Sequence, residues 1–525
     1  MLIDKKQSGK HYLIQQLNHK FEALSRYPII CLIVIGLIGF LVRFYYFPYD
    51  VPLTLDAVGY FWYAIDMSVL GRFPEGYNFP NNGWPAFVSV FFSLINSTNF
   101  LDYMHLQRYL SIAISVLTII PVYLTCTRFF NKSYSLLGAA LFVFDPRIIQ
   151  NSLSGITEPS YILLGSLVLF FILSKKMTSI YAAFGITALF SLVRYEGLFA
   201  IVALSIIFFL RFIKNRKTIP KYFVAMTIFL LVLLPMAYIR TATTGNDGLT
   251  SHAIGSPAAY YGSSIAGLPD RPPLSELVSK SLTYFSQYLV WVMIPIFGFF
   301  APSGTVLFFK KWDYKKTTVL LFSVVLILPA LYAYSRGFQD TRYLFVMFPI
   351  FAILSLYTIE KINEKIRNFG LIWLLVIIFI FSSSILFLSF KDFNYERELE
   401  SFKIAELVVV NAKGVNDHYP ESKYYFVSKL SEYEFPTLSS SVSTGPILFA
   451  TEGFGSLEEF IERYRDQGLT HLVVDNSEKR PDFLRRVFLD EKSYPYLIKE
   501  FDSHENGFTY YVKVYSINYD EFDRK

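Results

Sequence analysis

Residues 145–159 read DPRIIQNSLSGITEP, a polar stretch that interrupts an otherwise apolar part of the chain. Two apolar segments of spanning length overlap its ends, at 134–150 and 157–174. Charged side chains are costly in a bilayer core, so Asp145, Arg147 and Glu158 are expected near the ends of membrane helices. The stretch therefore predicts a turn at a membrane surface that carries chemically useful groups.

The same alternation of apolar and polar segments continues from residue 27 to residue 390. Hydrophobic residues make up 53% of the 525 residues and charged residues 17%, against roughly 25% charged in soluble domains. A span takes about 20 apolar residues. We therefore predict a polytopic α-helical membrane protein of about eleven spans, at 27–48, 104–126, 134–150, 157–174, 177–193, 197–213, 222–239, 285–309, 317–335, 343–359 and 369–390. The net charge of +6 reflects basic clusters between spans, and no nucleic-acid partner is expected.

Basic residues between the spans predict the orientation. Cytoplasmic connections carry an excess of Lys and Arg, and the basic clusters in 5–26, 211–221, 310–316 and 361–367 all fall on one side of the predicted bundle. We therefore predict a cytoplasmic N-terminus and a C-terminus outside. Residues 1–26 are polar and basic, and the apolar segment after them is long, so no cleavable signal peptide is expected.

Residues 391–525 differ from the rest, because charges become dense and apolar runs shorten to strand length. Strand-like runs alternate there with helix-like stretches, at 424–428, 447–451, 471–475, 496–501 and 509–517 for strands and 396–412, 457–466 and 481–489 for helices. This alternation predicts a small extracytoplasmic α/β domain at 391–525. The transmembrane domain is then 1–390, with a long first outer loop at 49–103. Both cysteines, Cys31 and Cys126, lie in apolar segments, so no disulfide framework is available.

The predicted outer connections contain acidic residues and arginines, namely Asp56, Asp66, Asp145, Arg147, Glu158, Arg194, Glu196 and Arg342. Guanidinium groups match phosphate geometry, and a carboxylate can take a proton from an acceptor hydroxyl. A second carboxylate could hold a divalent cation such as Mg or Mn. If the helix ends converge, this set suits transfer from a lipid phosphate. Aromatic stretches at 60–70 and 84–95 would then shape a groove for a polyprenyl chain.

Each of these residues also has a structural interpretation. Asp56 could cap the helix that follows it, and Glu158 could stabilise a helix N-terminus through the dipole. The others could form ion pairs, turns or interfacial anchors, namely Asp145, Arg147, Arg194, Glu196 and Arg342. The occurrence of several such positions on one side favours a site more than any single position does.

The order of these motifs resembles the GT-C superfamily of multispan glycosyltransferases, which use lipid-phosphate sugar donors. The similar elements are Asp56 before an aromatic helix and the Gly71–Pro74 turn, the stretch 146–158, the stretch Arg194–Gly197, and Arg342-Tyr343 followed by Pro349. Together they cover roughly residues 27–390.

This resemblance implies transfer of a sugar, usually with inversion, from a dolichyl- or undecaprenyl-phosphate carrier to an extracytoplasmic protein, lipid or glycan acceptor. It implies that Asp56 is the base or acceptor-binding carboxylate and Glu158 the second acid, and that any metal would be held by these two. Arg342, with Arg194, would contact the donor phosphate. The remaining candidates for substrate binding are Asp66, Asp145, Arg147 and Glu196.

Two alternative functions are an oligosaccharyltransferase and a transporter or lipid-handling protein. Oligosaccharyltransferases move a whole glycan to protein, and their catalytic subunit carries a Trp-Trp-Asp-Tyr-Gly motif that the tail of this chain lacks. Protein mannosyltransferases usually show Asp-Glu where this chain has Asp56-Ala57. A transporter or lipid-handling protein would place charges near the bilayer midplane and often show repeats, whereas here the charges lie at predicted span ends. A single-sugar transferase is therefore favoured.

Overall fold

The computed structural model describes residues 26–54, 56–77, 81–213, 217–249, 273–390, 395–409, 412–417, 421–425, 427–442, 446–478 and 480–524. The chain divides into two compact units. The helical unit comprises Met1–Phe47, Leu70–Phe91 and Gln107–Asp392. The sheet unit comprises Pro48–Val69, Phe92–Leu106 and Phe393–Lys525. Residues 250–272, between the predicted spans 222–239 and 285–309, lie outside the described residues.

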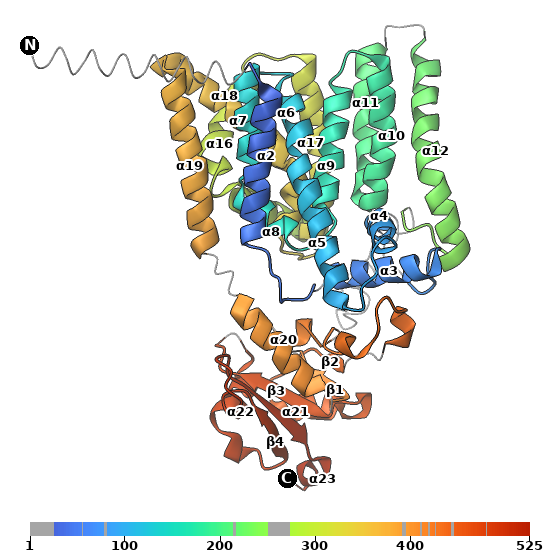
Figure 1. The fold of residues 1–525 in the computed structure, drawn as a ribbon, viewed down its shortest axis with the longest axis vertical. Helices are drawn as coiled ribbons and strands as arrows, with labels where there is room; N and C mark the ends of the chain where they lie inside the picture. Colours follow the sequence, from blue (N-terminus) through green and yellow to red (C-terminus); the bar gives the residue numbers. More distant parts are fainter. Residues whose placement is uncertain are drawn as a thin grey trace, which may run out of the picture. The chain divides into compact units, whose positions relative to one another are not determined.

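The helical unit is a bundle of apolar helices (Figure 1). In chain order these are α2 (Pro28–Tyr45), α4 (Gly83–Phe92), α5 (Phe100–Leu117), α6 (Ile119–Cys126), α7 (Lys132–Val143), α8 (Pro146–Ser152), α9 (Glu158–Ile172), α10 (Met177–Val193), η1 (Tyr195–Gly197), α11 (Leu198–Phe212), α12 (Thr218–Thr244), α15 (Leu274–Met293), α16 (Phe297–Phe308), α17 (Tyr314–Ser335), η2 (Thr341–Met347), α18 (Phe348–Ile366) and α19 (Phe369–Phe390). α4 ends, and α5 begins, within the sheet unit.

The described helices include seven that are long and apolar enough to cross a membrane, or eight if the bent pair α15–α16 counts as one span. Four shorter apolar helices, α4, α7, α9 and α10, accompany them. Large apolar side chains such as Leu41, Leu231 and Ile378 are exposed on the outer helices, where lipid would solvate them. The chain is thus an integral membrane protein built mainly of helices, as predicted. The count of eleven spans and the orientation stay predictions.

Two predicted spans are broken. The segment 134–150 divides at Phe144 and Asp145 into α7 and α8, because the Asp145 carboxylate accepts from the amides of Arg147 and Ile148 and starts a new helix. The segment 285–309 contains the break between α15 and α16, whose axes differ by 114°. Both breaks expose backbone groups that need partners within the protein.

A buried arginine holds the first helix in the bundle. Arg43 of α2 is fully buried, and its guanidinium donates to the Ser152 hydroxyl (3.0 Å), the Ser115 hydroxyl (3.2 Å) and the Val143 carbonyl (3.1 Å). A charge inside a membrane protein requires such partners. Arg43 thereby joins α2 to α5, α7 and α8, and fixes the helices that lead to the turn before Glu158.

The sheet unit contains α3 (Asp56–Leu70), α20 (Tyr395–Val409) and a five-stranded sheet (Figure 1). The strands are β1 (Gly414–Asn416), β2 (Ile447–Phe449), β3 (His471–Asp475), β4 (Leu497–Asp502) and β5 (Val512–Ile517), in the order β2-β1-β3-β5-β4. β1 is parallel to β2 and β3, whereas β5 is antiparallel to β3 and β4. The helices α21 (Leu457–Tyr464) and α22 (Asp482–Leu489) bury apolar residues together with β3, and the short α23 (Tyr519–Phe522) follows β5. The predicted small α/β tail is present.

One predicted strand in the tail is wrong. Residues 424–425 and 427–428 form turns, with the amide of Val427 donating to the Tyr424 carbonyl (3.0 Å) and the amide of Ser428 donating to it as well (2.8 Å). These local bonds replace a strand ladder, and the apolar character of the run reflects burial of Tyr424 and Tyr425. The short 3₁₀ turns of the tail are η3 (Glu421–Lys423), η4 (Leu430–Glu432), η5 (Ser439–Ser441), η6 (Arg465–Gln467) and η7 (Glu491–Ser493).

Candidate active site

Two glutamates and an arginine meet at one end of the α9–α10 hairpin. Glu158 is the first residue of α9, and Arg194 directly follows α10, so the packed pair brings both to the same end. The Arg194 guanidinium donates to Glu158 Oε1 (2.8 Å) and to Glu196 Oε1 (2.6 Å). Glu158 is 3% exposed and Glu196 is 8% exposed. One guanidinium therefore pairs with two buried carboxylates.

A second arginine approaches the same glutamate. Arg342 Nη1 lies 4.0 Å from Glu158 Oε1. Asp340 orients Arg342, because its carboxylate accepts from Arg342 Nε (2.6 Å) and from the Arg342 amide (2.8 Å) at the start of η2. The side chain of Arg342 is 39% exposed, compared with 17% for Arg194. Arg342 is therefore the more accessible cation of the cluster.

Aromatic rings support the buried arginine. The Arg194 guanidinium carbon lies 5.7 Å from the centroid of the Tyr161 ring, which stacks on Phe190 with the centroids 4.1 Å apart. A guanidinium over an aromatic face gains electrostatic stabilisation. The rings restrict the rotation of Arg194 and keep its fork directed at the two glutamates.

Side chains from outside the α9–α10 hairpin donate hydrogen bonds to the turn before Glu158. The Gly155 carbonyl accepts from Trp84 Nε1 (3.2 Å) and from Gln107 Nε2 (2.7 Å), and the Leu153 carbonyl accepts from Arg108 Nε (3.1 Å). Gly155 has a φ of 71°, which favours glycine. Since α9 begins three residues later, these bonds fix the position of the Glu158 carboxylate.

The first loop also contacts the Arg194 element. Asn81 Oδ1 accepts from the Tyr195 amide (3.3 Å). At Gly83, an added Cβ would lie 2.8 Å from the carbonyl carbon of Leu192, two residues before Arg194. The loop can approach this backbone closely because Gly83 has no side chain.

We therefore expect Gly83→Ala to disturb the site while the bundle remains folded. The new methyl group would press on the Leu192 backbone, at a cost of about 1–3 kcal/mol, and would displace Arg194. The unfolding temperature of the solubilised protein and its affinity for a phosphate-containing lipid should both fall. Gly298→Ala is the matched control, because its added Cβ would meet nothing closer than 3.6 Å. Equal behaviour of the two variants would contradict the close approach.

Asp145 and Arg147 take part in helix-end contacts. Asp145 is fully buried and caps α8. Arg147 Nε donates to the Ile294 carbonyl (3.1 Å) at the break between α15 and α16, and its guanidinium lies over the Phe387 ring at 5.0 Å. These contacts do not join the two residues to the Glu158 cluster. A role for either in substrate binding stays a prediction.

Asp56 and Asp66 belong to the sheet unit, so the structure does not group them with Glu158. Asp56 is exposed in the first turn of α3, as a helix-start acid would be. Asp66 is 4% exposed and accepts from the amide of Ser439 (2.7 Å) and from its hydroxyl. Asp66, predicted to bind substrate, therefore has a contact with the tail.

A metal fits the described cluster poorly. The described residues contain no group of three or more His, Cys, Asp or Glu side chains that could hold an ion. Glu158 and Glu196 both bind the Arg194 guanidinium, which already supplies the positive charge. A metal shared by Asp56 and Glu158 stays a prediction, and the proposed mechanism uses none.

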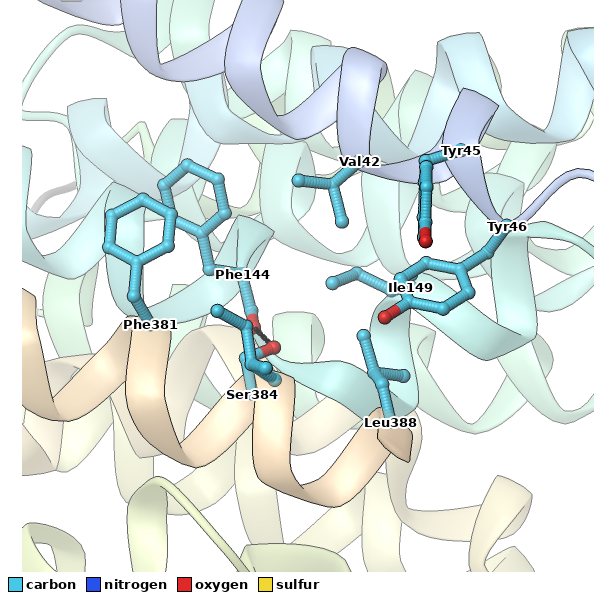
Figure 2. Close-up of a pocket in the computed structure, with 9 residues that line it drawn as sticks. Val42, Tyr45, Tyr46, Phe144, Ile149, Phe381, Ser384 and Leu388 are labelled. Carbon is cyan, nitrogen blue, oxygen red and sulfur yellow. Dashed lines mark hydrogen bonds between the residues drawn. The ribbon is translucent and has the colours of Figure 1, made fainter. Parts of the chain in front are cut away.

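An apolar hollow of about 310 Å³ lies between α2, the α7–α8 break and α19 (Figure 2). It is lined by Val42, Tyr45, Tyr46, Phe144, Ile149, Phe381, Ser384, Ile385 and Leu388. The Ser384 hydroxyl donates to the Phe144 carbonyl (2.6 Å), as the dashed line in Figure 2 marks. No charged residue lines the hollow, so it offers contacts to hydrocarbon and no evident chemistry.

Several residues that position the site are not marked as such by the sequence. Asp340 could have been suspected, because it stands two residues before Arg342 on a short polar connection. Trp84, Gln107 and Asn81 carry no such signal, because their partners are distant in sequence.

No protein-family model and no curated protein sequence matches this chain. Several solved structures match it. The oligosaccharyltransferase of Archaeoglobus fulgidus in the apo form is 12% identical, with a TM-score of 0.58 over 90% of this chain and 73% of that one. The same organism's AglB, in complex with an inhibitory peptide and a dolichol-phosphate, is 13% identical, with a TM-score of 0.57 over 90% and 72%. Another crystal of the Archaeoglobus enzyme holds Zn and sulfate.

ArnT from Cupriavidus metallidurans, bound to undecaprenyl phosphate, is 10% identical, with a TM-score of 0.52 over 93% of this chain and 97% of that one. At such identities the likeness concerns the fold alone. The resemblance predicted from the motifs is confirmed for the fold, which this chain shares with the archaeal oligosaccharyltransferase and with ArnT.

Proposed function

We propose that this protein is a membrane glycosyltransferase that moves a sugar from a polyprenyl-phosphate donor to an acceptor outside the cytoplasm. The observation that carries the proposal is the cluster of Glu158, Arg194 and Arg342 at a helix end within a GT-C fold. Guanidinium groups near a membrane interface suit a lipid phosphate. The dolichol-phosphate bound to AglB and the undecaprenyl phosphate bound to ArnT support a carrier of this class.

The two arginines would have different roles. Arg342 is the more exposed and would contact the donor phosphate, with Asp340 fixing its direction. Arg194 is engaged by both glutamates and would support the site electrostatically, so its expected direct contact with phosphate becomes secondary. Glu158 Oε1 lies 2.8 Å from the Arg194 guanidinium and 4.0 Å from that of Arg342, so it would hold the two guanidinium groups close together.

Asp56 would act as the base. Its carboxylate would take the proton from the acceptor as the acceptor atom attacks the anomeric carbon and the bond from that carbon to the phosphate oxygen breaks. Arg342 would stabilise the charge that returns to the phosphate. A single displacement of this kind inverts the anomeric centre. The proposal includes eleven spans, a cytoplasmic N-terminus, a transmembrane domain at 1–390 and an extracytoplasmic domain at 391–525.

The test starts from the protein purified in lipid nanodiscs. Co-purifying lipid is extracted and its mass measured, and the protein is then supplied with radiolabelled polyprenyl-phosphate sugars and a membrane extract as the acceptor source. A labelled covalent product and a polyprenyl phosphate among the bound lipids are expected. Transport of lipid or solute into proteoliposomes without any covalent product would instead establish the transporter alternative.

We expect Asp56→Asn to lower the transfer rate about 100-fold or more, because proton transfer to a positioned base contributes that much. Initial rates at saturating donor provide the measurement. Asp50→Asn is the control, since Asp50 is another exposed acid of the same loop. A variant that folds and transfers at the wild-type rate would remove Asp56 from the mechanism.

Transfer of a whole glycan to protein is the second candidate, and the likeness to the Archaeoglobus enzyme over 90% of this chain favours it. The absence of tryptophan from residues 391–525 counts against it. An asparagine sequon peptide distinguishes the two. Glycosylation of the peptide with a lipid-linked oligosaccharide, abolished by EDTA, would favour whole-glycan transfer.

A further inference from the structure

A segment of the tail forms hydrogen bonds to α3, the helix that carries Asp56. Both Oδ atoms of Asp66 on α3 accept from Ser439, Oδ1 from its amide (2.7 Å) and Oδ2 from its hydroxyl. Asp66 is 4% exposed. Hydrogen bonds to a buried carboxylate are stronger than bonds between neutral groups. Residues that are 373 positions apart are thus joined within the sheet unit.

Phe435 adds an apolar anchor to the same helix. Its ring centroid lies 6.2 Å from that of Phe61 and 6.0 Å from that of Trp62, both on α3. It also lies 6.0 Å from Phe100 and 6.2 Å from Tyr103, at the start of α5. Phe435 is 4% exposed, so the ring fills a gap between the two helices. Phe435 and Ser439 together form what we call the clasp.

The orientation of α3 depends on such contacts. The helix has 15 residues, a length at which isolated helices are marginal in water. Asp56 is its first residue, and Phe61, Trp62 and Asp66 follow along the same helix. A rigid helix transmits a rotation at Asp66 to Asp56, because all its backbone bonds are internal. Loosening the clasp would therefore let the Asp56 carboxylate move.

We propose that Phe435 and Ser439 are positioning residues, which hold α3 so that Asp56 faces the acceptor. This inference rests on the proposed function of Asp56. The inference gives the tail a defined role. Asp56, the proposed base, belongs to the same compact unit as the tail. Acceptor contacts made by the tail would then be coupled to the placement of the base.

The experiment uses the full chain in lipid nanodiscs and has a structural arm and a kinetic arm. The structural arm measures hydrogen exchange of the α3 amides. Exchange should be about tenfold faster in Ser439→Ala, which loses one bond to a charged group, and about 100-fold faster in Phe435→Ala, which leaves a cavity. Ser439→Thr keeps the hydroxyl and should restore protection. Ser441→Ala is the matched control, because Ser441 is exposed and bonds only within its own segment.

The kinetic arm measures kcat and the donor KM. Both clasp variants should lower kcat about tenfold or more at unchanged donor KM, and Ser439→Thr should recover the rate. Unchanged α3 exchange in both variants would overturn the clasp. Faster exchange with unchanged kcat would overturn its positioning role. If the wild-type protein transfers no sugar, the proposed function fails, while the exchange measurement still decides whether the clasp holds α3.

Discussion

Replacement of Arg194 by alanine is expected to destabilise the helical unit by about 3–5 kcal/mol and to abolish sugar transfer. The guanidinium lies 2.8 Å from Glu158 and 2.6 Å from Glu196, and both glutamates are nearly inaccessible to solvent. Without it, the two buried carboxylates would keep only Arg342, 4.0 Å from Glu158, as a nearby cation. One would have to bind a proton, or the α9–α10 end would have to open.

Three further variants make this prediction specific. Arg194→Lys keeps the charge but has no planar fork, so it should serve one carboxylate and recover only part of the stability. Arg194→Ala combined with Glu196→Gln removes one uncompensated charge and should regain stability without regaining transfer. Arg336→Ala is the control, because Arg336 is exposed at the end of α17 and contacts the Tyr332 ring. Thermal unfolding in detergent and initial transfer rates are the measurements. An unchanged unfolding temperature for Arg194→Ala would contradict the bridging role.

The sequence predicted a membrane protein built mainly of helices, because apolar content and segment length decide that much of the structure. It did not predict the helix breaks. The segment 134–150 reads as one apolar run, but Asp145 caps a new helix, and this choice depends on the buried surroundings of its carboxylate. Likewise a strand is expected at 424–428 because buried tyrosines resemble strand residues in composition, whereas the described residues 424–425 and 427–428 form turns. Hydrophobicity indicates burial more reliably than backbone conformation.

The candidate site could be predicted where its contacts are local. Arg194 and Glu196 are two residues apart, and Glu158 meets Arg194 because consecutive helices joined by a short turn pack against each other. The long-range contacts could not be predicted. The bond from Trp84 to Gly155 joins residues 71 positions apart, and neither residue carries a sign of its partner. The site therefore depends on loop packing that periodicity does not encode.

The tail contains a buried acid with a consequence for stability. Glu421 is fully buried in the sheet unit, and this burial raises the pKa of its carboxyl from the ordinary 4.5 to about 8. The negative charge of Asp475 raises the pKa further, whereas Tyr510 and Arg480 lower it. Asp475 is itself paired with Arg480 (3.1 Å) and accepts from the Tyr510 hydroxyl (2.5 Å). Tyr425 and Arg397 are the other titratable groups beside this network.

Glu421→Gln should therefore abolish a loss of tail stability that develops between pH 4.5 and about pH 8. Between pH 4.5 and about 8 the folded tail keeps the Glu421 proton and the unfolded tail releases it, so stability falls as pH rises. The limiting slope is about 1.4 kcal/mol per pH unit, and the loss is complete above the folded pKa. Glutamine cannot ionise, so the variant should be the more stable protein at pH 8 and above.

Hydrogen exchange of the β3 amides in the full chain, expressed as the ratio of variant to wild type at each pH, isolates this effect because the intrinsic exchange rate cancels. The ratio should fall by up to tenfold per pH unit between pH 6 and pH 8 and then level off. Glu432→Gln provides the control, because Glu432 is exposed and its ratio should stay near one. A flat ratio for Glu421→Gln would mean that Glu421 is ionised in the folded tail. Its countercharge would then have to come from Arg480 or Arg397, the two arginines beside it.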